Sequence, residues 1–261
     1  MVVVSRAAAC RLFLRNLALH TAAISLTSES VTAGGLDEVR KAASVLPGYG
    51  PPDLLFPGVF LGRWRVSSTV TDVKTPMGDA SAPQEYREAI ALLNSPPLTF
   101  EQRFVATEDG TVIADRAFNA VRRAAAMPGA ASLQDLQAKW VSTNPNVLTL
   151  TVLSTGSVVE TKVTKRAADS PFDGAFGTSE YARIADAGSS GVVSAIPSIK
   201  AERVQIRYKW DAATDGAAPA RVIEALELRE IFDPTATGFA DLAGATPVLR
   251  VKSRLRLDRI S

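Results

Sequence analysis

Apolar and polar side chains alternate along several long stretches of the chain, which is typical of β-strands that bury one face and expose the other. In the first stretch, Trp64, Val66 and Val70 occupy even positions, and the odd positions between them are polar. Two β-branched runs separated by Ser-Thr-Gly predict a hairpin. Strands are therefore predicted over residues 62–74, 98–106, 147–153, 158–164, 200–210 and 248–258.

Three further segments have less regular patterns. Residues 221–232 carry an acid at every third position, which a helix also allows, but the turn-rich segments on both sides favour a strand. Residues 111–115 predict a short strand that leads into a helix over 116–127, where Pro-Gly follows. Another short helix is expected over residues 36–46.

The predicted strands can bury their apolar faces by packing as two sheets or by closing into a barrel. The length of the last strands favours a barrel, because a long strand at an open edge is an aggregation hazard. The chain shows no internal repeat and no second composition regime. The expected fold is a single antiparallel β-barrel of about eight to ten strands over residues 57–261, with one or two short helices, preceded by a linker over 34–56.

The first 33 residues differ in composition from the rest. Arg6, Arg11 and Arg15 accompany an apolar stretch, no acid occurs before Glu29, and small residues end the segment at Ala33. This order is typical of a targeting leader that is cleaved off. The alternative is an N-terminal amphipathic helix that belongs to the core.

Charge and rare residues exclude several function classes. The 29 Lys and Arg against 27 Asp and Glu give a net charge of +2, too small to indicate nucleic acid binding. No apolar run reaches the roughly 18–20 residues of a membrane-spanning helix. Cys10 and His20 are the single residues of their types, and both lie in the leader. A cleaved chain would therefore lack thiol and imidazole chemistry, and we expect no cofactor and no metal site.

Four phrases in a fixed order carry a resemblance to a known family. They are FLGRWRVSST from Phe60, ADRAFN from Ala114, NPNVL from Asn144 and FGTSEY from Phe176. From about residue 56 to 232 the chain resembles a plant, algal and cyanobacterial family known as domain of unknown function 6816. The resemblance implies residence in the thylakoid lumen, for which a leader of 33 residues is short. It implies no reaction and no catalytic residues.

The opening Gly62-x-Trp64 also resembles the entry signature of lipocalins. In that family the Trp closes the barrel floor and an Arg of the final strand packs across it. Arg254, Arg256 or Arg259 is placed for this role. The alternative is a Trp that is simply part of the core.

The polar residues of the family phrases are candidates for a charged group at the mouth of a pocket. A simpler interpretation is preferred for the first of them: Asp115 caps the following helix and Arg116 pairs locally. Ser179 beside Glu180 is not a hydrolase arrangement without a His base, so Lys or carboxylate chemistry is left as the alternative. The candidate polar cluster is Asp115, Arg116, Asn119, Ser179 and Glu180.

Two surfaces of the predicted barrel are candidates for binding. Inward aromatic side chains would line a cavity for one small apolar molecule, or would fill the barrel. These are Trp64, Phe100, Phe104, Tyr208 and Trp210. Outward basic side chains would form a face that docks an acidic protein partner in the thylakoid, unless acids of residues 221–230 pair with them across strands. These are Arg203, Arg207, Arg250, Lys252, Arg254 and Arg256.

The absence of aromatic residues on the basic face argues against nucleic acid as the partner. Residues 167–198, rich in Gly, Ser and Asp, are expected to form a loop that acts as a lid or a partner contact. The expected function is non-enzymatic. The protein would bind a small apolar ligand inside the barrel, or dock on a photosynthetic complex as an accessory or assembly factor. A His-free hydrolase or isomerase is the alternative.

Overall fold

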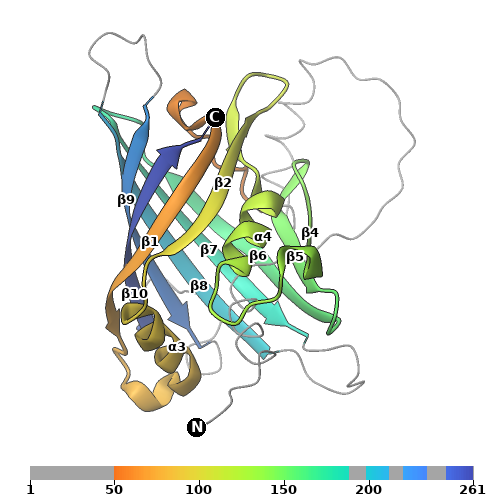
Figure 1. Cartoon of the computed structure of the whole chain (residues 1–261), viewed down its shortest axis with the longest axis vertical. Coiled ribbons are helices and arrows are strands. Elements are labelled where there is room, and N and C mark those ends of the chain that lie inside the picture. Colours follow the sequence, from red (N-terminus) through yellow and green to blue (C-terminus); the bar gives the residue numbers. More distant parts are fainter. Residues whose placement is uncertain (1–49, 188–197, 212–219, 234–244, 261) are drawn as a thin grey trace.

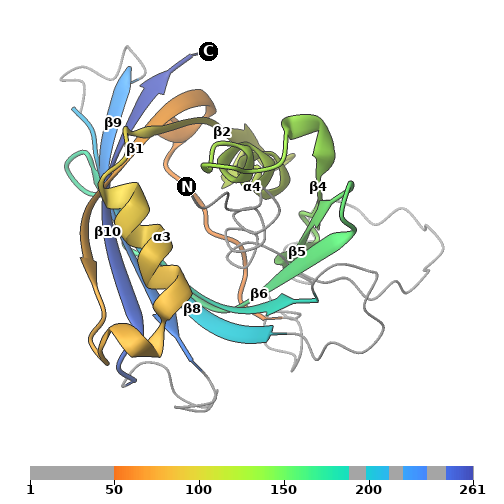
Figure 2. The ribbon, with the colours of Figure 1, turned by 60° about the horizontal axis from the view of Figure 1, so that its bottom comes forward.

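The computed structural model describes residues 50–187, 198–211, 220–233 and 245–260. Its main element is one antiparallel sheet of ten strands, in the order β3-β2-β1-β10-β9-β8-β7-β6-β5-β4. Figure 1 shows these strands side by side, and Figure 2 shows the sheet curled into a half-barrel. The strands are β1 (Gly62–Lys74), β2 (Leu98–Ala106), β3 (Val112–Ala114), β4 (Leu136–Val141), β5 (Asn144–Val152), β6 (Ser157–Ala168), β7 (Ala175–Asp186), β8 (Ser198–Lys209), β9 (Val222–Phe232) and β10 (Leu249–Arg259).

The predicted mainly β fold is confirmed, and so are the alternating strands. β1 and β2 have the predicted bounds, β5 and β6 form the predicted hairpin, and β9 is a strand rather than a helix. The long strands β8, β9 and β10 lie inside the sheet, with a neighbour on each side. Their length is therefore no edge hazard.

Two α-helices accompany the sheet in the described residues, α3 (Pro83–Leu93) and α4 (Arg116–Ala125). α4 contacts β2, β4 and β5 and lies across the open side of the half-barrel (Figure 2). α3 contacts β1 and β10, and its Ala89 and Tyr86 pack with inward residues such as Leu249. Short 3-10 turns occur at Gly58–Phe60, Asp79–Ser81 and Leu133–Asp135.

Several elements differ from the sequence predictions. The segment expected to be a loop over 167–198 contains the twelve-residue strand β7, so that prediction is wrong for residues 175–186. Its Gly and Ser residues masked the alternation of Phe176, Thr178 and Ala182 on the inner face. α3 and β4 were not predicted. The expected helix over 36–46 and the leader lie outside the described residues.

The residues that lead into β1 pass through the inside of the half-barrel (Figure 2). Phe56 forms an isolated bridge with Val112, with its N–H donating to the Val112 carbonyl at 2.8 Å. Leu54 and Phe60 are buried. The interior therefore contains this segment together with α3 and α4, all supplied by the chain itself.

Candidate functional site

The aromatic candidates for a ligand cavity pack on one another. Trp64, Phe100, Phe104 and Tyr208 are buried in one cluster, and Trp210 packs against it partly buried. Phe60, from the segment before β1, lies among them. Its ring centroid is 5.2 Å from that of Phe104, 5.0 Å from that of Tyr208 and 5.7 Å from that of Trp210. At this end of the half-barrel the candidate lining residues therefore form a packed core.

Trp64, near the start of β1, contacts both the segment before β1 and the end of β10. The Trp64 indole N–H donates to the Phe60 carbonyl at 2.6 Å. The Arg259 guanidinium lies over the indole, 4.3 Å from the ring centroid, and donates to the carbonyls of Leu61 and Val59 at 2.6 and 2.5 Å. Of the three arginines considered from the sequence, Arg259 packs across Trp64, joining the end of β10 to the start of β1.

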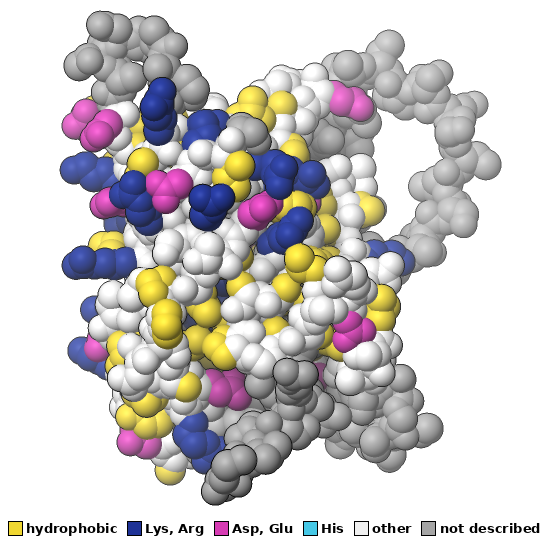
Figure 3. All heavy atoms as spheres, in the orientation of Figure 1, with side chains coloured by type: hydrophobic (Ala, Val, Ile, Leu, Met, Phe, Trp, Pro, Cys, Tyr) yellow, Lys and Arg dark blue, Asp and Glu magenta, His cyan; other side chains and the backbone are white. Residues whose placement is uncertain are grey.

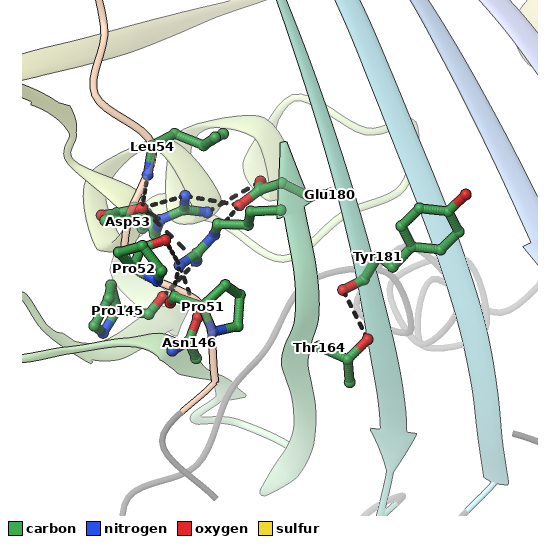
Figure 4. Close-up of polar contacts among 11 residues, drawn as sticks. Pro51, Pro52, Asp53, Leu54, Pro145, Asn146, Thr164, Glu180 and Tyr181 are labelled. Atoms are coloured by element: carbon green, nitrogen blue, oxygen red, sulfur yellow. Dashed lines mark hydrogen bonds and ion pairs between the residues drawn. The ribbon is translucent and has the colours of Figure 1, made fainter. Parts of the chain in front are cut away.

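A second cluster joins the segment before β1 to α4 and β7, and we call it the strap cluster. It consists of Asp53, Arg116, Asn146, Arg166 and Glu180. Arg116 is the first residue of α4, and its Nη2 lies 2.6 Å from Asp53 Oδ1 and 2.8 Å from Glu180 Oε1. Figure 4 shows Asp53, Glu180 and Asn146 converging on this point. The expectation that Arg116 pairs locally is wrong, because its partners are 63 and 64 residues away in the chain.

Arg166 reaches this cluster because of a β-bulge. The register of β6 on β7 shifts between Val163 and Lys165, so Thr164 is an extra residue in β6. Strict alternation from Val163, which is buried, would turn Arg166 outward, whereas the bulge turns it inward opposite Glu180. The Thr164 hydroxyl donates to the Tyr181 carbonyl at 3.3 Å beside the bulge (Figure 4).

The Arg166 guanidinium is 3% exposed and its donors meet oxygen atoms from three segments. It donates to Glu180 Oε1 at 2.5 Å, to Asn146 Oδ1 at 2.7 Å and to the Pro145 carbonyl at 2.8 Å. It also donates to the carbonyls of Pro52 and Pro51 at 3.1 and 3.3 Å. The bonds to Pro51 and Pro52 hold the segment before β1 in the half-barrel, and each gives a partner to a backbone carbonyl of that segment.

The strap cluster is electrostatically balanced, with two arginines facing two carboxylates. Burial alone would raise the pKa of Glu180, but the charges of Arg116 and Arg166 outweigh it and lower the pKa to about 2. Burial also opposes the charge of Arg116, yet Glu180 and Asp53 raise the pKa of Arg116 above its usual range. Burial and the nearby Arg116 lower the pKa of Arg166. Glu180, Arg116 and Arg166 therefore stay ionised at neutral pH.

The other polar candidates have structural contacts. Asp115 caps α4 as predicted, with Oδ1 accepting the Phe118 N–H at 3.0 Å, and its Oδ2 pairs with Arg103 at 2.5 Å. The Asn119 side chain accepts from the Arg103 N–H at 2.7 Å and donates to the Arg103 carbonyl at 3.1 Å, which ties α4 to β2. Ser179 pairs with Gln205 of β8 and lies on the outer face, opposite to Glu180. The structure does not bring Ser179 into the cluster.

A buried charged network that the sequence did not indicate lies deeper in the interior. Arg123 is two helical turns from Arg116 on the same face of α4, and its Nη2 lies 2.6 Å from Glu227 Oε1 of β9. Arg229 Nε lies 2.7 Å from Glu202 Oε1. Burial raises the pKa of Glu202, whereas for Glu227 the charge of Arg123 outweighs burial and lowers the pKa. Burial also raises the pKa of the Tyr208 hydroxyl. Each carboxylate thus has an arginine partner.

The outer face of β8, β9 and β10 carries the basic candidates. β9 lies between the other two, and the cross-strand pairing expected from the sequence is present at two of its acids. Glu230 lies 3.3 Å from Arg203 and 2.7 Å from Arg250, and Glu224 lies 3.6 Å from Arg256. Lys252 is 3.8 Å from Asp72. Lys and Arg side chains gather along the left edge of the surface in Figure 3, where β1, β9 and β10 run.

An open groove of about 940 Å³ crosses this outer face from β1 to β7. Its lining includes basic side chains, the exposed Leu226 of β9, and Phe172 from the turn before β7. Three of the outer basic candidates, Arg207, Arg254 and Arg256, lie within it, together with Lys209. Phe172 and Leu226 are 82% and 60% exposed, which is unusual for such large apolar side chains beside a groove.

The model of the family known as domain of unknown function 6816 (DUF6816) matches residues 48–261. The chain belongs to this family. The match covers the whole described half-barrel and extends beyond the segment whose phrases resemble it. No curated protein and no solved structure matches the chain.

Three of the four DUF6816 phrases meet at the strap cluster. ADRAFN supplies Arg116, NPNVL supplies Asn146 and FGTSEY supplies Glu180, while FLGRWRVSST supplies Trp64 at the aromatic end. The phrases therefore supply three of the five residues of the strap cluster, and Asp53 and Arg166 lie outside them.

Within the residues that the structure describes, no three or more His, Cys, Asp or Glu side chains gather as a group that could hold a metal ion. No helix in those segments is long and apolar enough to cross a membrane. Cys10 and His20 lie outside them.

Proposed function

We propose that this DUF6816 chain is a non-catalytic accessory protein that docks on another protein, with the half-barrel as a rigid scaffold. One contrast carries the proposal: the inside is occupied by the chain's own α3, α4 and residues 50–60, whereas the outside has an open groove with exposed apolar and basic side chains. A filled scaffold with an exposed mixed patch is typical of a protein interaction site.

The interior favours this function over a cavity for a small apolar ligand. A ligand-binding barrel keeps apolar space open, but here Phe56, Phe60 and Phe176 lie against the candidate lining residues, with ring centroids 4.8 to 6.3 Å apart among the contacting pairs. The interior also argues against catalysis by carboxylates. Glu227, Glu202 and Glu180 are each engaged by buried arginines, which is the arrangement of internal ion pairs.

We also propose that the protein works in the thylakoid lumen and that its partner belongs to a photosynthetic complex. The basic, acid-poor composition before Ala33 and its small-residue end support a translocation signal. Immunoblotting of fractionated chloroplasts or thylakoids, with N-terminal sequencing of the recovered chain, tests this location. Recovery outside the thylakoid, or with Met1 retained, would contradict it.

Velocity sedimentation of an extract of the source cells tests the docking function. We expect the chain to sediment in an assembly larger than a single chain, whose mass is at most 27.6 kDa, and to shift to the mass of a single chain in high salt. Sedimentation as a single chain at physiological salt, across the range of extract concentrations, would contradict the proposal.

A further inference from the structure

We infer that the outer groove binds an acidic segment of the partner protein, with Phe172 and Leu226 as its apolar contacts. This inference rests on the proposed docking function and specifies its surface and the chemistry of its partner. The groove is defined here by two rows of side chains that cross five strands.

The register of neighbouring strands gives the residues of each row directly. The first row runs Ser67, Arg256, Glu224, Lys209 and Ala175, from β1 through β10, β9 and β8 to β7. The second row runs Thr69, Arg254, Leu226, Arg207 and Gly177 along the same strands. Residues directly opposite one another on neighbouring strands have their side chains on the same face.

The rows have small side chains at both ends, and charged side chains together with Leu226 between them. Ser67 and Thr69 close one end, and Ala175 and Gly177 the other. Four strand spacings of about 4.8 Å make the rows roughly 19 Å long, which matches about six residues of extended peptide. The groove therefore has the length of a short segment of extended chain.

The charges of the groove favour an acidic occupant. Arg256 pairs with Glu224 and Asp258, and Arg207 lies 3.9 Å from Asp169. Within the part of the chain described, Arg254 and Lys209 form no ion pair, and both are exposed. The lining thus holds four basic side chains, Arg207, Lys209, Arg254 and Arg256, against the two acids Asp169 and Glu224, an excess of two positive charges.

Leu226 lies between two arginines in the second row, with Arg254 on one side and Arg207 on the other. A partner segment with carboxylates on both sides of an apolar residue would match this order. Carboxylates accept paired hydrogen bonds from a guanidinium, and the apolar residue would cover Leu226. Phosphate backbones and lipid headgroups have no such alternation, so a protein segment fits best.

Phe172 begins a tight turn whose hydrogen bonds fix its backbone. Phe172 and Ala175 exchange both backbone hydrogen bonds, at 3.1 and 2.9 Å, and Asp173 between them has a positive φ of 46°. The Trp210 N–H donates to the Gly174 carbonyl at 2.8 Å, which fixes the turn to the end of β8. Gly174 also has a positive φ, of 66°, and an Asp-Gly pair with both φ values positive is the preferred sequence of a two-residue type I′ hairpin turn. The turn thus holds the Phe172 ring beside the groove.

Site-specific photo-crosslinking in an extract of the source cells tests the inference. The full chain carries p-benzoylphenylalanine in place of Phe172, and in a matched control in place of Leu153, an apolar residue 54% exposed on the β5–β6 turn. Mass spectrometry then identifies the crosslinked peptide. We expect a protein crosslink from position 172 to a segment rich in Asp and Glu. Adding Arg254→Glu and Lys209→Glu should lower its yield about tenfold.

The other outcomes are distinct. Crosslinks from position 153 but not from 172 overturn the groove while leaving the docking function in place. A crosslink from 172 to lipid, nucleic acid or a segment without excess acid overturns the inference, as does a yield that survives the double charge reversal. Crosslinks from neither position, together with sedimentation as a single chain, overturn both proposals. Circular dichroism of each variant and the charge control Lys165→Glu, on the outward side of β6, verify that the fold is kept.

Discussion

Replacing Arg166 by methionine removes the group on which the strap cluster depends. Methionine keeps a similar length of apolar chain but none of the hydrogen bonds to Glu180, Asn146 and Pro145 at 2.5 to 2.8 Å. Breaking a buried ion pair by removing one partner typically costs about 3–5 kcal/mol of unfolding free energy. Glu180 keeps Arg116 as a partner, and the repulsion between the two arginines is relieved. We therefore expect the low end, about 3 kcal/mol.

The assay is equilibrium unfolding in urea, with Lys165→Met as the matched control. Lys165 is the neighbouring residue of β6 and is exposed, so its replacement should change the unfolding free energy by less than about 0.5 kcal/mol. Hydrogen exchange gives a local readout. The Phe56 N–H, bonded to Val112, should lose protection in Arg166→Met because the segment before β1 is released. An unfolding free energy within 1 kcal/mol of the unmodified chain, with Phe56 still protected, would refute the reasoning.

Three further changes test the interior charges and the groove. Folding lowers the pKa of Glu180 from 4.5 to about 2, so its ionised form contributes roughly 3 kcal/mol to the unfolding free energy above pH 4.5, and this contribution is lost as the pH falls towards 2. In Glu180→Gln the unfolding free energy should therefore depend less on pH between 4.5 and 2. An unchanged pH dependence over that range would contradict this. Glu227→Gln should lower the unfolding free energy in urea more than Glu202→Gln does, because folding lowers the pKa of Glu227 but raises that of Glu202. A larger loss in Glu202→Gln would be inconsistent with the network. Gly177→Ala should change the unfolding free energy by less than about 0.5 kcal/mol, because the new Cβ meets only the end of the Asp169 side chain, which is 66% exposed and can turn away. A loss well above 1 kcal/mol in urea unfolding would show that Asp169 cannot move.

Alternation in the sequence was enough to predict most of the sheet. β1 and β2 have their predicted bounds, because their large apolar side chains lie on one face: Trp64 and Val66 are buried in β1, and Phe100 and Phe104 in β2. β7 was missed since Gly177 and Ser179 occupy its outer face, where small and polar residues resemble a loop. α3 begins at Pro83 after an irregular turn, and its face against the sheet is made of small side chains such as Ala89.

The roles of the site residues were predictable where they depend only on residues nearby in the sequence. The cap formed by Asp115 follows from its place before a helix. The inward turn of Arg166 was not predictable, because one extra residue at Thr164 reverses the alternation and no local signal marks it. The pairing of Arg123 with Glu227 joins residues 104 apart, and becomes visible only once α4 is placed against β9.

Native mass spectrometry of the protein isolated from its own compartment tests the central claim most directly, since it reports bound small molecules and bound proteins together. We expect the isolated chain to carry no lipid- or pigment-sized adduct and to be released from a complex with another protein as the salt concentration rises. A stoichiometric small apolar molecule on the chain, in the absence of any protein partner, would contradict the account.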